Sequence, residues 1–273
     1  MEKNKIKKLL LILLCLPMVV LAQKTYVPDD NFEQRLIYLG YDNALDDSVI
    51  TANINTVTSL ITNNQNISDL TGIEDFTALT DLYCSDNQLT SLDVSNNTAL
   101  TVLSCWGNQL TSLDVSNNTA LIDLSCNNNQ LTSLDVSGAT ALTDLNCHSN
   151  QLTSLDVSNN TALTWLECWG NQLTSLDVRN GNNTNFVVFS ATNNPSLTCI
   201  NVDDWQYSLF NWGNIDPQHY FSNNCNPSAI QELTTNKELL KVTDLLGRET
   251  KQTNQPLFYI YDDGTVEKKI IIE

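Results

Sequence analysis

The sequence predicts a mainly β solenoid, in which a short unit repeats along the chain and each copy adds one coil. The segment NQLTSLDVSNNTAL occurs almost unchanged at Asn87–Leu100, Asn108–Leu121 and Asn150–Leu163, and diverged copies begin at Asn129 and Asn171. Five leucines recur every 21 residues, at Leu79, Leu100, Leu121, Leu142 and Leu163. Five cysteines keep the same step, at Cys84, Cys105, Cys126, Cys147 and Cys168. A fixed period of this length indicates stacked coils.

Each unit contains two similar halves. The unit Leu100–Ala120 begins Leu-x-x-Leu-x-Cys-x-x-Asn and then restarts as Leu-x-x-Leu-x-Val-x-x-Asn, which gives half-turns of 10 and 11 residues. Alternation of apolar and polar residues predicts a short strand in each half, with one side buried. Strands of successive coils would stack in parallel at about 4.8 Å. Their leucines would then form one continuous core that no single coil could bury alone.

This pattern resembles bacterial leucine-rich repeat proteins in a nested form, where both halves of the unit carry the leucine motif. The resemblance covers residues 57–204, and the longer first coil, LITNNQNISDLTGIEDFTAL, is similar to an internalin-type repeat. The last coil departs from the motif at Phe186 and Phe189, after an insertion near Asn182. The resemblance implies a C-terminal cap at 205–227, closed by a disulfide between Cys199 and Cys225.

Two rows of asparagine are expected at the bends, where side-chain amides can bond unpaired backbone groups. The first row is unbroken, at Asn87, Asn108, Asn129, Asn150 and Asn171. The second row (Asn97, Asn118, Asn160) is interrupted by Ala139 and Gly181. We therefore expect the second edge to be the looser one.

The five repeat cysteines occupy an inward position where a small apolar residue is required. Secreted proteins favour disulfides, so a bonded ladder is one hypothesis. Side chains stacked in register point in parallel, which is a poor geometry for bridging, and no Cys-x-x-Cys pair suggests zinc. We therefore predict buried free thiols at these positions.

The N-terminus is predicted to be a signal peptide, residues 1–22. Four lysines precede an apolar run, Leu9–Leu21, which ends at the small residue Ala22. The run is too short to favour a membrane span, and nothing after Ala22 looks like one. The mature protein is thus expected outside the cell or on the outer-membrane surface.

An N-terminal cap is expected over residues 23–56. Asp30 and Glu33 have the spacing of a capping box, Phe32 and Leu36 share one helical face with Leu39, and Gly40 follows them as a stop signal. The predicted short helix would shield the open edge of the first coil. The segment DNALDDSV is faintly similar to a calcium loop but lacks its central glycine.

Residues 228–273 differ in character, since lysines reappear and Asp263-Gly264 marks a hairpin turn. The segment resembles the C-terminal sorting domain of proteins exported by the type IX secretion system of Bacteroidetes. The matching residues are Val242–Glu249, Tyr259, Asp263-Gly264 and Lys268–Glu273. The resemblance implies interaction with that secretion machinery. An ordinary small β domain is the alternative.

The charge of the chain excludes several classes of partner. The formal net charge is −18, and between residues 25 and 236 the only basic residues are Arg35 and Arg179. Removal of residues 1–22 would make the balance more acidic still. Nucleic-acid phosphates require compensating cations, so we exclude nucleic acid, and an anionic membrane surface is disfavoured for the same reason. Solubility outside the cell is the plain explanation of the acidity.

Function is predicted on the outward side of the first half-turn, because its residues differ in every coil while those of the second half-turn barely change. Flat aromatic rings give large contact area at low entropic cost. Trp106 and Trp169, three coils apart, would lie about 14 Å from each other. We expect this side to bind an extracellular protein or glycan, through the candidate residues Tyr83, Trp106, Asn127, His148, Trp165, Glu167 and Trp169. Rings that merely rest on neighbouring side chains are the alternative.

No cofactor is expected, and catalysis is not predicted. His148 and His219 lie in no paired motif, and a single solenoid offers only a shallow face. A spacer protein without specific ligand is the first alternative to a binding protein, and a glycan-processing enzyme the second. A row of like-charged carboxylates would stack at strand spacing, at Asp93, Asp114, Asp135, Asp156 and Asp177. Hydrogen bonds from neighbouring serine and threonine hydroxyls are the simpler explanation of how the row is tolerated, and bound calcium is the alternative.

Overall fold

The computed structural model describes residues 22–225, 239–243, 249–250, 256–261 and 266–270. These residues form two compact units, divided between Cys225 and Asn226. The expected signal peptide lies outside the described residues except for Ala22, so its assignment stays a prediction. Within the described ranges, no helix is both long and apolar enough to cross a membrane.

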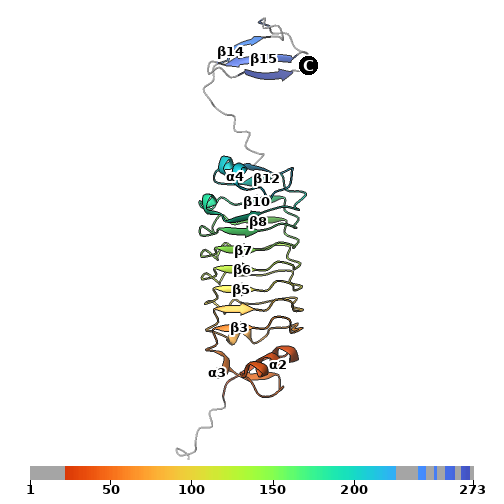
Figure 1. Ribbon diagram of the computed structural model, residues 1–273, viewed down its shortest axis with the longest axis vertical. Helices are drawn as coiled ribbons and strands as arrows, with labels where there is room; N and C mark the ends of the chain where they lie inside the picture. Colours follow the sequence, from red (N-terminus) through yellow and green to blue (C-terminus); the bar gives the residue numbers. More distant parts are fainter. Residues whose placement is uncertain (1–21, 226–238, 244–248, 251–255, 262–265, 271–273) are drawn as a thin grey trace, which may run out of the picture. The chain divides into compact units, whose positions relative to one another are not determined.

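The first unit is a β solenoid whose coils stack along one axis (Figure 1). The first half-turns form a seven-stranded parallel sheet in the order β11-β9-β7-β6-β5-β4-β3. The leucines of neighbouring coils lie in register, as in the pairs Leu82–Leu103 and Leu103–Leu124. The seven strands are β3 (Ser59–Ile61), β4 (Asp81–Tyr83), β5 (Val102–Ser104), β6 (Asp123–Ser125), β7 (Asp144–Asn146), β9 (Trp165–Glu167) and β11 (Val188–Ser190). The predicted fold class is thereby confirmed.

The second half-turns form a regular sheet only toward the C-terminal end of the solenoid. Its parallel strands are β8 (Ser154–Asp156), β10 (Ser175–Asp177), β12 (Cys199–Asn201) and β13 (Tyr220–Ser222). In earlier coils the same residues are extended, with one isolated bridge between Asp114 and Asp135, and the first coil has a 3-10 helix there, η1 (Ile73–Asp75). Two strands per coil therefore occur in the later coils, whereas the earlier ones carry one.

The core is the column of leucines, valines and cysteines between the two half-turns. The repeat cysteines are buried and are not bonded to one another. Burial raises the pKa of the Cys105 and Cys168 thiols to about 12. These thiols behave as small apolar side chains and are poor nucleophiles, because the thiolate is the reactive form.

The first asparagine row joins successive coils. Asn129 donates its amide hydrogens to the carbonyls of Cys105 and Cys126, each at 3.1 Å, and its oxygen accepts from the Leu110 N–H at 3.0 Å. The equivalent asparagines in the neighbouring coils repeat this pattern. One side chain thus bonds backbone groups of two coils, and each cysteine carbonyl accepts from the asparagines of two successive coils.

The second asparagine row extends further along the solenoid than the sequence predicted. Asn118 and Asn160 each donate to two carbonyls of the preceding coil. At the position where Gly181 interrupts the 21-residue step, Asn180 donates to the carbonyl of Asn160 at 3.0 Å. The expected break at Gly181 is therefore wrong, because the neighbouring asparagine makes the bond after the coil changes length.

The N-terminal cap contains β1 (Lys24–Tyr26), which pairs antiparallel with β2 (Ser48–Ile50), and two helices, α2 (Asp30–Leu39) and α3 (Thr51–Ile54). Phe32 and Leu36 of α2 are buried in the same core as the coils, and Gly40 ends the helix at a φ of 81°. The predicted helix and its stop signal are confirmed.

The predicted capping box is wrong by one residue. Asp29 caps helix α2 by accepting from the N–H groups of Asn31 and Phe32. The Glu33 carboxylate instead accepts from the N–H of Asp46, in the loop before β2, and from the N–H of Ser48, the first residue of β2. The carboxylate of Asp29 also accepts from Ser68, which fixes the helix to the first coil.

The C-terminal cap closes the other end of the solenoid. Helix α4 (Trp205–Asn211) is capped by the Asp204 carboxylate, and a second 3-10 helix, η2 (Asn183–Asn185), precedes β11. Trp212 stacks on Phe189 with ring centroids 4.2 Å apart and meets Phe221 edge-on at 5.7 Å. A disulfide joins Cys199 to Cys225, as the resemblance implied.

The second unit is a three-stranded antiparallel sheet of β14 (Leu239–Thr243), β15 (Pro256–Tyr261) and β16 (Val266–Ile270). The predicted hairpin turn at Asp263-Gly264 lies outside the described residues. A small β domain is present at the expected position, and its role in sorting stays a prediction.

Candidate binding face on the seven-stranded sheet

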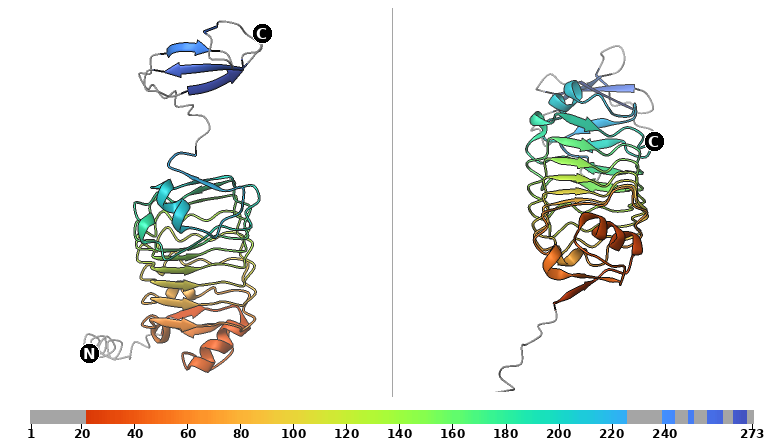
Figure 2. Two further views of the ribbon diagram at one scale, coloured as in Figure 1. Left: turned by 45° about the horizontal axis from the view of Figure 1, so that its top comes forward. Right: turned by 60° about the horizontal axis from the view of Figure 1, so that its bottom comes forward.

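The candidate site is the outward side of the sheet formed by the first half-turns, whose strands are among the stacked arrows of the solenoid in Figure 2. We define the variable face as the outward residues of strands β4, β5, β6, β7 and β9, together with the next outward residue of each coil. Coil by coil, they are Asp81, Tyr83, Ser85; Val102, Ser104, Trp106; Asp123, Ser125, Asn127; Asp144, Asn146, His148; and Trp165, Glu167, Trp169.

Two tryptophans of the variable face are open to solvent. Trp106 is 36% exposed and Trp165 is 37% exposed, while Tyr83 on β4 is half-buried. The Trp165 indole donates to the Glu167 carboxylate at 3.3 Å, and the Asn146 amide donates to the same oxygen at 3.1 Å. The Trp165 ring is therefore held in one orientation by a carboxylate on its own strand.

Trp169 is partly covered by a neighbouring ring of the same face. Its ring stacks on His148, with centroids 3.9 Å apart and planes inclined by 14°, and both side chains are half-buried. Burial lowers the pKa of His148, and the Glu167 charge opposes this shift only in part. His148 is therefore neutral at physiological pH. For this pair, the expectation that rings rest on their neighbours describes the structure better than the expectation of free anchors.

Asn127, another predicted contact residue, is only 8% exposed. Its carbonyl accepts from the Gly107 N–H and from the Asn129 amide. Asn127 thus holds the bend of its coil and offers little surface to a partner. Spacing alone placed it beside Trp106 and His148, but the exposure of a bend residue depends on the side chains around it.

The variable face is acidic. Asp123 and Asp144 lie directly opposite each other on β6 and β7. The pKa of Asp123 is raised, first by burial and second by the charge of Asp144. None of the outward residues is a lysine or an arginine, so the negative charges on this face have no permanently cationic neighbour among these residues. A partner carrying lysine or arginine would relieve that repulsion.

The second half-turns carry the repeated side of the solenoid. Asp93, Asp114 and Asp135 each accept from the N–H of the serine two residues later, at 2.9 Å. These serine hydrogen bonds also lower the pKa of each aspartate. The stacked carboxylates are thus held by backbone N–H groups of their own coils, whereas the hydroxyl-donor explanation expected serine and threonine hydroxyls; the serine side chains contribute to the lowered pKa values as well. Asp156 and Asp177 make the same turn with Ser158 and Arg179.

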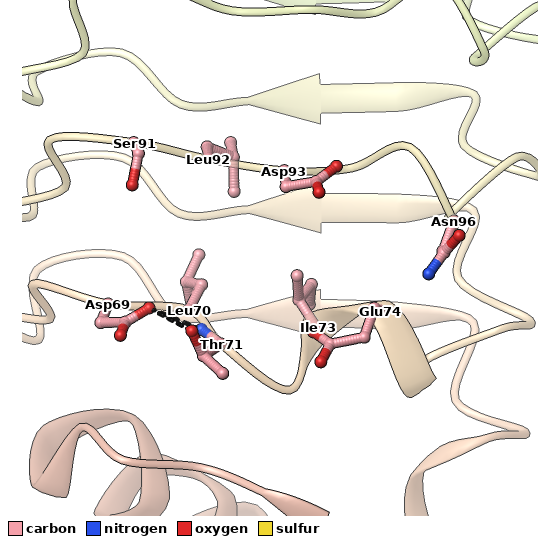
Figure 3. A pocket seen from close by; sticks show the side chains of 9 residues that line it. All are labelled: Asp69, Leu70, Thr71, Ile73, Glu74, Ser91, Leu92, Asp93 and Asn96. Atoms are coloured by element: carbon pink, nitrogen blue, oxygen red, sulfur yellow. Dashed lines mark hydrogen bonds between the residues drawn. The ribbon is translucent and has the colours of Figure 1, made fainter.

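A pocket of about 340 Å³ opens on this repeated side between the first two coils (Figure 3). Asp69, Glu74 and Asp93 contribute carboxylates to it, and Leu70 and Leu92 form its floor. Asp69 already accepts from the N–H and hydroxyl of Thr71, drawn as dashed lines. Sequence reasoning missed this pocket because it needs the 3-10 turn of the first coil, which the repeat does not predict.

The site offers little for catalysis. His148 Nδ1 lies 3.0 Å from Ser149 Oγ, but among the described residues no carboxylate forms a hydrogen bond with its other ring nitrogen. His219 is buried against Asp216 and the carbonyl of Asn194. In the part of the chain that the structure describes, the aspartate row forms no group able to share one metal ion, whereas Asp30, Glu33 and Asp47 do.

The repeat segment is similar to known proteins in sequence and in fold. Residues 77–118 match the family model "Leucine Rich repeats (2 copies)". Internalin J of Listeria monocytogenes serotype 4b (strain F2365) is 39% identical over 72 residues, which is 26% of this chain and 8% of Internalin J. The chain therefore spans a small part of the length of that relative.

Two solved internalin structures from Listeria monocytogenes str. 4b F2365 share the fold. Internalin inlF has a TM-score of 0.53 at 23% identity, with 72% of this chain and 56% of that chain covered. Internalin C2 has a TM-score of 0.53 at 21% identity, with 77% and 94% covered. At these identities the likeness concerns the fold.

Proposed function

Because the chain is a leucine-rich repeat protein with internalin-like homologues, we propose that it is a secreted or cell-surface binding protein. Its ligand is an extracellular protein with a basic surface, bound on the variable face. Trp106 and Trp165 are the anchors, Tyr83 lies on β4, next to the strand that precedes Trp106, and Glu167 lies on β9 with Trp165. The leucine-rich repeat fold itself favours protein partners over substrates.

The observation that carries the proposal is the contrast between the two sides of one repeat. The second half-turn keeps serine and aspartate at its outward positions, whereas the first half-turn carries different residues in every coil. A scaffold alone needs no such variety. Exposed tryptophans on a rigid sheet are a hot-spot composition, and here they occur on the varied side.

The structure revises which aromatic residues should make contact. Trp169 stacks on His148, and Asn127 is nearly covered. We therefore assign Trp169 and His148 to support of the face, and we assign contact to Trp106 and Trp165. The Glu167 carboxylate holds the Trp165 ring and adds negative charge that a lysine or arginine of the partner can approach.

The test is capture of partners by the full chain, with variants that remove the anchors. Immobilised protein is exposed to extracellular proteins from the producing cells, and bound proteins are quantified by mass spectrometry. The Trp106→Ala, Trp165→Ala double variant should lose at least tenfold of the specific signal, because hot-spot truncation commonly costs about 2 kcal/mol or more.

Trp205→Ala is the matched control, since Trp205 is 45% exposed but lies on helix α4, outside the variable face. It should capture as the unmodified protein does. Equal capture by both variants would contradict the anchor assignment. Binding that appears only on a glycan array would identify a glycan ligand in place of a protein, and no binding at all would favour a spacer.

We further propose that residues 1–22 direct export and that residues 228–273 serve as the type IX sorting signal. The basic and apolar pattern at the N-terminus and the match of the C-terminal segment support this route. Deletion of 228–273 in producing cells should retain the solenoid in the periplasm, measured by fractionation and immunoblot. Surface display of the deleted protein at the normal level would contradict the sorting role.

A further inference from the structure

Three carboxylates meet where helix α2 begins. Asp30 is the first residue of the helix, Glu33 lies one turn later, and Asp47 directly precedes strand β2. Ligand oxygens of the three side chains all lie within 4.8 Å of one another. Within the described ranges no ion pair includes any of the three, so three like charges are held together without a basic partner.

The backbone brings this group together. The Glu33 Oε1 accepts from the N–H of Asp46 at 3.0 Å and from the N–H of Ser48 at 2.9 Å. These two bonds wrap the loop around the helix, and Asp47 between them adopts a left-handed φ of 59°. The carbonyl of Asp47 is held by the Val27 N–H. The loop is therefore fixed on both sides of Asp47.

The second carboxylate oxygen of Glu33 is an independent observation that points to a ligand at this position. Glu33 is completely buried, and its Oε2 has no hydrogen-bond partner among the described residues. A buried carboxylate oxygen without a partner is strongly unfavourable. The nearest lysine does not supply it, because Lys24 donates to Asp46 and Ser48.

We propose that Asp30, Glu33 and Asp47 bind one calcium ion, a site independent of the variable face. Calcium takes six to eight oxygen ligands in flexible geometry, whereas magnesium demands a near-ideal octahedron and keeps its waters. Three carboxylates from a helix and a loop provide hard oxygen ligands, and Glu33 Oε2 gains a partner. The ion would join α2 to the loop before β2, and thus fasten the helix whose Phe32 and Leu36 side chains are buried in the core.

The test is isothermal titration of the full chain with calcium chloride after treatment with a chelator. One equivalent should bind, with magnesium much weaker, and saturating calcium should raise the melting temperature by on the order of 5 °C relative to chelator. Asp47→Asn should weaken calcium binding at least tenfold and abolish this rise. The variant should fold, because Asp47 is exposed and asparagine tolerates a positive φ.

Asp135→Asn is the matched control, since it removes one carboxylate from the aspartate row and should leave calcium binding unchanged. Glu33→Gln is a second variant, which keeps an oxygen acceptor for the loop and removes the charge. Absence of binding heat in the unmodified protein would overturn the proposal. So would unchanged affinity in Asp47→Asn, and loss of binding in Asp135→Asn alone would place the ion on the row.

Discussion

Single side chains decide how one coil is joined to the next. The amide of Asn129 bonds one carbonyl of its own coil, and one carbonyl and one N–H of the preceding coil. Asn118, in the second row, donates two bonds, but its oxygen has no partner among the described residues. The first row therefore contributes more per residue, because both ends of its amide are used.

Asn129→Ala should lower the free energy of unfolding by about 2 kcal/mol, since it removes three buried hydrogen bonds and leaves the buried Leu110 N–H without its partner. Urea denaturation followed by circular dichroism measures the change. Asn117→Ala, at an exposed bend position, should stay within about 0.5 kcal/mol of the unmodified protein. Equal effects of the two variants would contradict the joining role of the first row.

The Asp29 carboxylate makes the free energy of unfolding depend on pH. Burial alone would raise its pKa, but hydrogen bonds from Ser68, Phe32 and Asp69 outweigh burial and hold it below the ordinary 3.8. A folded-state pKa below the unfolded value gives stability that is complete above about pH 4 and is lost as the pH falls through the folded pKa.

Asp29→Asn should therefore destabilise the protein by about 1–2 kcal/mol at neutral pH. The difference between the two proteins should shrink as the pH falls below 3.8, because the unmodified carboxylate is then protonated as well. Urea midpoints measured from pH 6 downward, with a chelator present, test this. A difference that stays constant with pH would show that the charge of Asp29 is irrelevant.

Whole elements show how far local sequence determines structure. The segments Ser91–Asp93 and Ser154–Asp156 are identical in sequence, yet only the second forms a strand of a regular sheet. The difference lies in their neighbours, since the first coil presents the 3-10 turn η1 while β10 and β12 continue the sheet at the other end. Leu92 is correspondingly only partly buried, whereas its counterpart Leu155 is buried.

The same reasoning explains what the sequence could and could not predict. The coil, its strand register and its core follow from the 21-residue step, because only one stacking aligns every leucine. Three details do not follow from that step. Asp29 caps helix α2, Asn180 makes the hydrogen bond expected of an asparagine at position 181, and Asn127 is nearly covered. Each depends on contacts between segments that the repeat does not relate. For the candidate site, the side of the solenoid was predictable, but the division into contact and support residues was not.

The disulfide of the C-terminal cap closes a segment with a sequence separation of 26. The Cys199→Ala, Cys225→Ala double variant should lose about 3 kcal/mol from the constraint on the unfolded chain. Hydrogen exchange should show the loss of protection first in β12 and β13, because stability in stacked repeats is largely a nearest-neighbour property. Uniform loss of protection along all coils would contradict this view.

At the scale of the whole molecule, the stability of the solenoid is approximately the sum of contributions from its coils and from the contacts between neighbouring coils. Each coil contacts mainly the coils before and after it, as the pairing of successive strands shows. Ala120 and Ala141 occupy equivalent positions, 21 residues apart, so the chain can be rejoined between Ala120 and Leu142 without breaking the motif. The removed unit includes Gly138 and Ala139, which replace asparagines of other coils.

Deletion of residues 121–141 should therefore give a shorter, folded protein with an unchanged β-type circular dichroism spectrum. The same deletion brings Trp106 and Trp165 closer by one coil, about 4.8 Å, so partner capture should fall even though the fold survives. Circular dichroism, thermal melting and the capture assay measure the two effects. Unfolding of the deleted protein would contradict the additive solenoid, and unchanged capture would contradict a partner that reads the tryptophan spacing.

Helix α2 has one more consequence beyond shielding the core. It satisfies the last carbonyl of β3 through Arg35, which donates to Ile61 at 2.8 Å, and Asn31 bonds the carbonyl of Asn66 in the same coil. A bare first coil would present a row of open hydrogen-bonding groups, the kind of edge that recruits strands from another copy. Loss of this helix would thus turn the end of the solenoid into a template for growth of a fibre.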